Sequence, residues 1–345
     1  MAAAKTPLKE EPRFDGGLQE IAPATFAWIQ PNGGLGESNA GLIVGDNASL
    51  LIDTLWDERL TRRMLESMAP ALVTAPIRRL LNTHGDGDHW YGNGLLPEAE
   101  IHASAAAAAQ MREEPPTMLT RLSPLGPAAK LLGAVPTLPG RSSLQGIADF
   151  AEQLSNYDFK GISPRLPDQT FEGSSVFEAG GRTVEAIEVG PAHTAGDAIV
   201  WLADERIVFS GDIVFNRITP IMWAGPVENW IAALDRIVAL DPVAVVPGHG
   251  PICGFETVAE LRTYWTWLDA KVGPEAADDP LPVAESLVRS PEFSSAPWAS
   301  WSHPERTLIN VGLIARGKAG KGPIGTAMRI KLLGAMGALA KRLSR

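Results

Sequence analysis

One short segment decides how this chain folds, and it reads Thr83-His84-Gly85-Asp86-Gly87-Asp88-His89. It follows residues 77–82, an apolar run with the composition of a β-strand. Imidazole nitrogen and carboxylate oxygen are the protein ligands of zinc, iron and manganese. The two histidines and two aspartates within residues 84–89 therefore predict a metal site at the edge of a sheet.

Three further candidate ligands lie downstream, each in a loop of small residues after an apolar run. They are His193 in Gly190-Pro191-Ala192-His193-Thr194-Ala195-Gly196-Asp197, Asp212 in Phe209-Ser210-Gly211-Asp212, and His249 in Val246-Pro247-Gly248-His249-Gly250. The glycines at 85, 87, 248 and 250 are expected to let these loops turn, so that the ligand side chains converge. The whole set has the spacing of a two-metal hydrolase site.

In order and type, these residues resemble the metallo-β-lactamase superfamily and its glyoxalase II-like pattern. That pattern is His-x-His-x-Asp-His, then a lone His, an Asp and a final His. Asp86 departs from it, because it stands where most of the family has a second histidine. The resemblance implies two metal positions, held by His84, Asp86 and His193 and by Asp88, His89 and His249, with Asp212 as the bridge.

Two divalent metal ions are the expected cofactors, and zinc is the favoured metal. Iron and manganese stay open, because Asp86 gives the site a third carboxylate beside Asp88 and Asp212, and carboxylates favour harder metals. Aspartate is also shorter than histidine. A single ion at the second position is therefore an alternative.

The resemblance implies a hydrolase in which a metal-bound hydroxide attacks a carbonyl group. Asp88 would be the catalytic residue, orienting the hydroxide and passing a proton to the leaving group. We expect an ester, thioester or lactone with an apolar group, because the chain has an apolar insertion and no cluster of cations near the ligand loops. Arg217, with Asn216 beside it, is the one cationic candidate, and a phosphate substrate would want such cations.

Two other classes of function stay open. A di-iron redox enzyme, an oxygenase or a reductase of oxygen or nitric oxide, is the alternative, since flavodiiron proteins carry a carboxylate at the position of Asp86. Their carboxylate is typically glutamate, and this chain lacks the length and the phosphate-binding loop for their flavodoxin-like domain. A non-catalytic binding protein ranks third, because such a protein would be expected to lose several ligands.

The apolar runs predict an α/β (α+β) fold with two β-rich halves. We expect strands at 25–29, 40–44, 49–52, 77–82, 183–189, 198–202, 207–209 and 243–246, and helices at 57–68, 227–240 and 255–272. The resemblance implies that the halves stack as a four-layer αββα sandwich. A flexible segment over 1–20, a metallo-β-lactamase domain over 21–272 and a C-terminal extension over 273–345 complete the predicted organisation.

Residues 103–169 separate the halves and are expected to form a helical insertion that covers the site as a lid. Its candidates for contact with an apolar part of a substrate are Leu119, Leu122, Leu125, Leu131, Leu132, Val135 and Leu138. Packing on the sheet is an equal alternative, because an apolar helical stripe normally faces a core. His102 is expected in the core or beside the ligands, and His303 is expected outside the site.

The end of the chain is basic, with no acidic residue after Arg306. Residues 274–282 are expected to form an acidic linker, and residues 326–343 an amphipathic helix. A packed or solvated helix is the favoured interpretation, and contact with a membrane of anionic lipid or with an acidic partner is the alternative.

The composition of the chain limits which partners and which cellular compartment we expect. The chain has 345 residues, is 45% hydrophobic and 20% charged, and carries a net charge of −10. Such a charge argues against nucleic acid as a partner and favours a small-molecule substrate. A single cysteine, Cys253, excludes an internal disulfide, and no signal-peptide pattern opens the sequence, so we expect a cytoplasmic location. A homodimer stays open, by the resemblance alone.

Overall fold

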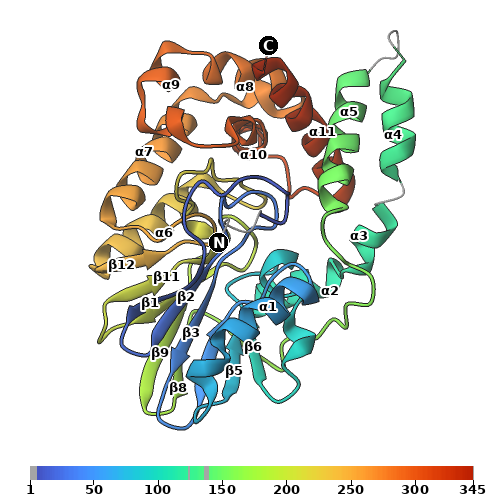
Figure 1. Ribbon diagram of the computed structural model, residues 1–345. Coiled ribbons are helices and arrows are strands. Elements are labelled where there is room, and N and C mark those ends of the chain that lie inside the picture. The colour runs from blue at the N-terminus through green and yellow to red at the C-terminus, as the bar shows by residue number, and fades with distance from the viewer. Residues whose placement is uncertain (1–5, 123–124, 136–139, 345) are drawn as a thin grey trace.

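The computed structural model describes residues 6–122, 125–135 and 140–344. Its strands form two sheets (Figure 1). Within the described residues the first sheet has seven strands in sequence order, β1 (Gly17–Ala22), β2 (Thr25–Ile29), β3 (Ala40–Val44), β4 (Ser49–Ile52), β5 (Ile77–Leu81), β6 (Glu100–Ser104) and β7 (Gln169–Phe171). Strands β1 to β4 pair antiparallel and β4 to β7 pair parallel. The strands predicted in this half are confirmed.

The second sheet has the spatial order β12-β11-β10-β9-β8. Its strands are β8 (Ser174–Ala179), β9 (Arg182–Glu188), β10 (Ala198–Leu202), β11 (Ile207–Phe209) and β12 (Ala244–Val246). Neighbours pair antiparallel, except that β11 and β12 are parallel. Strands β9, β11 and β12 therefore run in one direction, so the loops that follow them leave the same edge.

The two sheets face each other across an apolar core. Ile43, Ile52 and Leu81 of the first sheet pack with residues such as Val200 and Phe209 of the second. Helices cover the outer face of each sheet (Figure 1). The predicted αββα sandwich is confirmed.

Helix α1 (Glu58–Met68) covers the first sheet. Asp57 caps it, because its Oδ1 accepts a hydrogen bond from the Leu60 amide at 2.7 Å. Met64 and Met68 are fully buried against strands β4 and β5. The helix predicted at 57–68 is thus confirmed within one residue.

Helices α6 (Val227–Ala239) and α7 (Phe255–Lys271) cover the second sheet. They share one continuous core with the helices that follow, α8 (Leu281–Val288), α9 (Pro291–Ser295) and α10 (Thr307–Lys318). Trp230 and Trp265 contact each other in this core, with ring centroids 4.5 Å apart and planes tilted by 39°. The linker predicted at 274–282 is wrong, because Ala276 and Ala277 are buried and α8 begins at Leu281.

The insertion between the halves is helical, with α2 (Ala105–Glu113), α3 (Thr117–Leu122), α4 (Leu125–Gly133) and α5 (Arg141–Leu154). Among the apolar candidates predicted there, Leu119 is buried. Leu131, Leu132 and Val135 are 75%, 49% and 43% exposed, so they lie on the surface and not at the site. Leu138 lies outside the described residues, and only the backbone of residues 122 and 125 is described.

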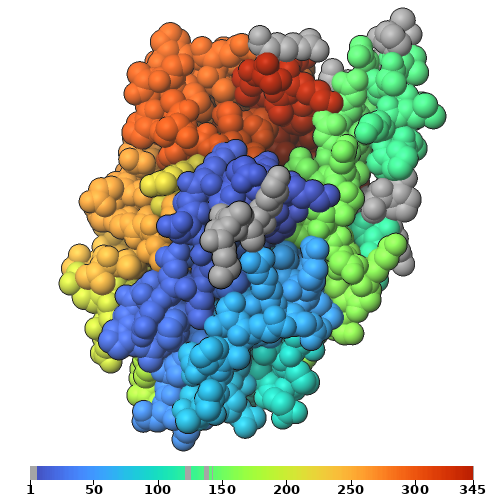
Figure 2. Space-filling model, in the orientation of Figure 1, coloured from blue at the N-terminus to red at the C-terminus, as the bar shows by residue number. Residues whose placement is uncertain are grey.

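The terminal helix α11 (Thr326–Leu343) has the predicted bounds and packs along α5 (Figure 1). In Figure 2 its red surface touches the green surface of the insertion. The backbones come very close, because a Cβ at Gly337 would lie 2.4 Å from the Cα of Gly146. Three of its basic side chains form ion pairs within the protein, Arg329 with Glu114, Lys341 with Asp149 and Arg342 with Glu285.

The described part of the segment expected to be flexible, residues 6–20, packs on the domain. Strand β1 begins at Gly17, and the Arg13 amide donates a hydrogen bond to Asn32 Oδ1 at 2.6 Å. Asn32 in turn donates to the Glu11 carbonyl oxygen at 2.9 Å. Over the described residues, no helix combines the length and the apolar character needed to cross a membrane.

Candidate metal centre

The candidate ligands come from four loops, and each loop follows a strand. Residues 84–89 follow β5, His193 follows β9, Asp212 follows β11 and His249 follows β12. Although these positions are far apart in the sequence, their side chains converge at one end of the sandwich. All seven predicted ligand residues lie in this cluster.

The first predicted metal position lies around His193. Its Nε2 is 3.1 Å from Asp86 Oδ2 and 3.3 Å from Asp212 Oδ2. His84 Nε2 lies 4.0 Å from Asp212 Oδ2. The ligand atoms of His84, His193 and Asp212 all lie within 4.8 Å of one another, close enough to share one ion.

The second predicted position lies around His249. Its Nε2 is 3.4 Å from both Asp88 Oδ2 and Asp212 Oδ2. His89 Nε2 is 3.2 Å from Asp212 Oδ1, and the ligand atoms of Asp88, His89 and His249 form a second group within 4.8 Å. Asp212 therefore contacts both groups, as a bridging carboxylate would.

Outer hydrogen bonds hold the histidine rings in place. His89 Nδ1 lies 2.9 Å from Asp53 Oδ2, and His193 Nδ1 lies 2.6 Å from the Ile221 carbonyl oxygen. A bond at Nδ1 leaves Nε2 free to face the centre, which is the usual arrangement of a metal-bound histidine. Neither partner was predicted, because both come from segments that only the fold brings close.

Asp53 also supports the neighbouring ligand through Thr83. The Thr83 amide and hydroxyl both donate to Asp53, each at 2.7 Å. The same hydroxyl lies 2.9 Å from His84 Nδ1. One buried carboxylate after β4 thus orients two ligands on the adjacent strand end.

Several buried atoms of the cluster lack a hydrogen bond. They include His84 Nε2, His89 Nε2 and Asp212 Oδ1. Buried polar atoms nearly always have a partner, and these face one another across the centre. Their donor set of imidazole nitrogen and carboxylate oxygen fits a divalent zinc, manganese or iron ion.

The charges of the cluster also fit a cation. Burial would lower the pKa of His193, but Asp212 and a second carboxylate outweigh it and raise that pKa to about 9. Burial and the neighbouring His89 lower the pKa of His84 to about 4. Burial would raise the pKa of Asp212, yet the surrounding histidines hold it well below its usual range. Without a metal, protonated histidine supplies positive charge to this cluster. A bound metal ion would supply that charge instead and release the protons.

Glycines in the ligand loops allow close packing as well as turning. A Cβ at Gly248 would lie 1.9 Å from Asp212 Oδ1, and one at Gly87 would lie 2.4 Å from Tyr91 Cζ. Among the four glycines singled out in the sequence, Gly250 has a positive φ, at +95°. The chain bends or makes a 3₁₀ turn at all four, as predicted, and at the other three a Cβ would also lack space.

A cavity of about 650 Å³ opens above the cluster. Its floor holds Asp86, Asp88, His193, Asp212 and His249. Its walls are mainly apolar and include Leu35, Trp56, Leu119, Phe150, Leu333 and Met336. A substrate that reaches the cluster would therefore contact apolar surface on the way.

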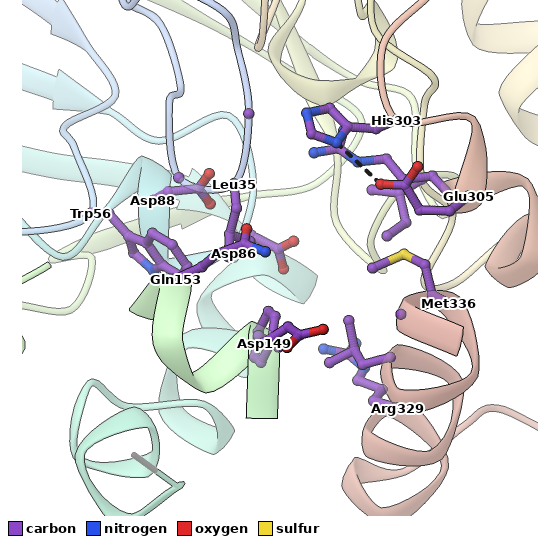
Figure 3. Close-up of a pocket in the computed structure, with 18 of the residues that line it drawn as sticks. Leu35, Trp56, Asp86, Asp88, Asp149, Gln153, His303, Glu305, Arg329 and Met336 are labelled. Carbon is purple, nitrogen blue, oxygen red and sulfur yellow. Dashed lines mark hydrogen bonds and ion pairs between the residues drawn. The ribbon is translucent and has the colours of Figure 1, made fainter. Parts of the chain in front are cut away.

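Two helices that are distant in sequence form the outer walls of this cavity. In Figure 3, Asp149 and Gln153 of α5 lie opposite Arg329 and Met336 of α11. Arg329 forms an ion pair with Glu114 at 2.7 Å. The C-terminal extension is thus part of the site.

No cluster of cations was expected near the ligand loops, yet three basic residues, Arg306, Arg329 and Lys341, line the cavity. All three lie beyond the last candidate ligand in the sequence. Arg217, the predicted candidate, has an exposed side chain and does not line it. The Asn216 amide is also directed elsewhere, because it donates to the Pro251 carbonyl oxygen at 2.9 Å.

The two remaining histidines have different positions. His303 lines the cavity and lies 3.2 Å from Glu305, so its expected place outside the site is wrong (Figure 3). His102 lies at the sheet, 3.1 Å from Glu100 and against the ring of Phe177. It takes no part in the cluster.

Comparison with known proteins agrees with the site. The sequence profile of the metallo-beta-lactamase superfamily matches residues 33–249. The metallo-beta-lactamase type 2 of Bacteroides fragilis is 29% identical over 123 residues, covering 34% of this chain and 49% of that protein. The linear primary-alkylsulfatase of a Pseudomonas species (strain ATCC 19151) is 24% identical over 241 residues, covering 64% of this chain and 43% of that protein.

Among solved structures, a stereoselective inverting sec-alkylsulfatase from Pseudomonas superimposes with a TM-score of 0.63 at 16% identity, covering 88% of this chain and 50% of that protein. This likeness concerns the fold. The chain spans about half or less of the length of the curated relatives that it matches. The profile match covers more than half of this chain, including all seven candidate ligands. The chain therefore belongs to the metallo-beta-lactamase superfamily.

Proposed function

We propose that this protein is a metal-dependent hydrolase of an ester, thioester or lactone-type carbonyl, with a substrate that carries an apolar group. The observation that supports this most is the position of the ligand cluster at the floor of a largely apolar cavity of about 650 Å³. Cavities of this size and lining typically bind small organic molecules.

A bound pair of divalent ions would supply a nucleophile from water at neutral pH and stabilise the negative charge that develops on the substrate oxygen. Asp88 would handle the proton, and its greater exposure supports this role: its side chain is 15% exposed, whereas that of Asp212 is 5% exposed. Burial would raise the pKa of Asp88, but His249 and His89 lower it, so the carboxylate is ionised at neutral pH. It can accept a proton from the attacking water and pass it to the leaving group.

The test is a panel of esters, thioesters and lactones, assayed with metal-loaded and chelator-treated protein. Alkyl sulfate esters belong in the panel, because two of the relatives above are alkylsulfatases. We expect turnover of a carbonyl substrate that is lost on chelation and regained when metal is added back.

Asp88→Ala should lower this turnover by about 10²- to 10⁴-fold, since a positioned acid or base contributes that much. Asp235→Ala is the control, because Asp235 is a surface residue of α6 that pairs with Arg262 at 2.6 Å. Equal turnover in the Asp88 variant and the wild type would rule out the proposed role of Asp88. Absence of carbonyl hydrolysis with every metal would reject the proposal.

A di-iron redox enzyme is the second candidate, and Asp86 is the observation that favours it. With Asp86, Asp88 and Asp212 the cluster has three carboxylates, which suit iron better than an all-histidine site would. Iron in the purified protein, with charge-transfer absorption and oxygen consumption, would favour this candidate over hydrolysis.

A further inference from the structure

Arg306 is a buried cation in the wall of the cavity. It lies at the end of a 3₁₀ turn, Pro304–Arg306, directly before α10, and is 8% exposed. Its Nη1 donates to the Thr219 carbonyl oxygen at 3.2 Å, and its guanidinium carbon lies 5.9 Å from the centroid of the Phe215 ring.

The Arg306 guanidinium has fewer hydrogen-bond and ion-pair partners than it could bind. Within the described parts of the chain its side chain forms that one hydrogen bond and no ion pair, although a guanidinium has five donors. The other cations of the cavity differ, because Arg329 pairs with Glu114 at 2.7 Å and Lys341 pairs with Asp149 at 2.8 Å. Arg306 alone among these three keeps its charge unpaired.

In the part of the chain that the structure describes, the carboxylates that act on this charge from a distance do not pair with it directly. Glu305, Asp212, Asp88 and Glu37 all act electrostatically on Arg306. Asp88 and Asp212 are candidate ligands, so bound divalent ions would neutralise them. Glu305 pairs with His303 at 3.2 Å. Bound divalent ions would therefore neutralise two of these four carboxylates and leave Glu305 and Glu37, neither of which forms an ion pair with Arg306 within the described residues. An oxyanion in the cavity would give the guanidinium the direct partner that it lacks.

The position of Arg306 directs such an anion toward the cluster. The Phe215 ring stacks on the ring of His249, with centroids 5.2 Å apart and an angle of 2° between the planes. Arg306 thus lies one aromatic ring away from a ligand histidine. An anion bound there would sit beside the reacting bond of a substrate whose apolar part extends along the walls.

We infer that Arg306 binds an oxyanion group of the substrate, a carboxylate, sulfate or phosphate, next to the metal pair. The inference deepens and rests on the proposed function, because it takes the substrate to bind in this cavity. It narrows the substrate class to anionic molecules with an apolar tail.

The test measures binding and not turnover. Four stable ligands of equal chain length, octanoate, octanesulfonate, octylphosphonate and the neutral 1-octanol, are titrated into metal-loaded protein by calorimetry. The wild type should bind at least one of the three anions more tightly than 1-octanol. Arg306→Gln, which keeps a donor for the Thr219 carbonyl oxygen, should weaken that anion about 10- to 100-fold and leave 1-octanol within about twofold.

Two further variants keep the result interpretable. Arg306→Lys should recover part of the anion affinity, because it restores the charge without the planar guanidinium. Arg182→Gln removes a partly buried arginine that pairs with Glu205 away from the cavity, and should change neither affinity. The metal content and thermal stability of each variant are measured too. Values equal to those of the wild type exclude misfolding as the cause of a change in affinity.

The inference is overturned if Arg306→Gln weakens the anions and 1-octanol equally, if it weakens neither, or if the wild type does not prefer an anion. Because no reaction is needed, these outcomes are separate from the proposed function. Selective anion binding without hydrolysis of any substrate would reject the hydrolase and support the role of Arg306.

Discussion

At the residue scale, Asp86 is the position that sets this centre apart from the usual pattern of the family. Its Oδ2 lies 3.1 Å from His193 Nε2, and its Oδ1 accepts a hydrogen bond from Gln110 Nε2 at 2.8 Å. Gln110 is 9% exposed and comes from α2 of the insertion. A residue of the insertion thus holds the unusual candidate ligand in place.

Asp86→His should shift metal preference toward zinc, because imidazole is the softer ligand. In competition between equal concentrations of zinc and manganese, we expect the bound ratio of zinc to manganese to rise at least about tenfold. Asp149→His, which adds a histidine to the cavity wall outside the cluster, is the matched control and should leave the ratio unchanged. An unchanged ratio in Asp86→His would show that Asp86 is not a ligand.

Glu37 gives a pH dependence that can be tested in chelator-treated protein. It is fully buried, and burial raises its pKa to about 7, with the hydrogen bond from the Gly34 amide acting in the other direction. A carboxyl with a raised pKa favours the folded state while it is protonated. As the pH rises from about 4.5 to 7 the unfolded chain loses this proton first, so the stability of the folded state falls.

Glu37→Gln removes the titrating carboxyl group and with it this loss of stability at rising pH. Its side-chain oxygen can still accept the hydrogen bond from the Gly34 amide. Relative to the wild type, the variant should gain about 2 to 3 kcal/mol of unfolding free energy between pH 5 and pH 8. Urea unfolding at both pH values measures the difference. Glu66→Gln, on the exposed face of α1, should show the same difference from wild type at both. A pH-independent effect of Glu37→Gln would contradict the raised pKa.

The sequence predicted which candidate ligands come together but not the residues that support them. The candidates follow apolar runs, and the resemblance to the family assigned them, among them His84, His193 and His249, to the two metal positions. Arg306 was not predicted, because the sequence around a single arginine does not show whether its side chain is buried. The helix α10 that follows it is buried over residues 307–315, and this burial fixes where Arg306 lies. That apolar run directly after an arginine was the available signal.

At the element scale, the contact between α5 and α11 shapes the cavity. A Cβ at Gly146 would lie 2.5 Å from the Gly334 carbonyl oxygen, and one at Gly337 would lie 2.4 Å from the Gly146 Cα. The bounds of α11 could be predicted from local sequence, whereas its place could not. Its place depends on glycines that lie nearly two hundred positions apart in the chain.

Gly337→Ala should therefore destabilise the protein by about 1 to 3 kcal/mol, because the added methyl group must separate two backbones. Gly317→Ala is a matched control in α10, where a Cβ meets nothing within 4 Å. It should stabilise by up to about 1 kcal/mol through helix propensity. Opposite signs in urea unfolding support the close contact, and stabilisation by both substitutions would contradict it.

At the scale of the whole molecule, both halves of the chain must fold before the centre exists. The first half supplies residues 84–89 and the second supplies His193, Asp212 and His249. Hydrophobic contact between the sheets brings these segments together, so we expect metal binding and assembly of the sandwich to be coupled. The C-terminal extension completes the cavity from the outer side, with α11 as one wall.

The central claim is that these residues hold a pair of metal ions, and metal content tests it most directly. Protein purified without chelator would be analysed by plasma mass spectrometry, both as isolated and after incubation with zinc, manganese or ferrous iron. We predict about two divalent ions per chain, falling in Asp212→Ala because the shared ligand is lost. Folded protein that holds no metal ion after any of these incubations would contradict the account.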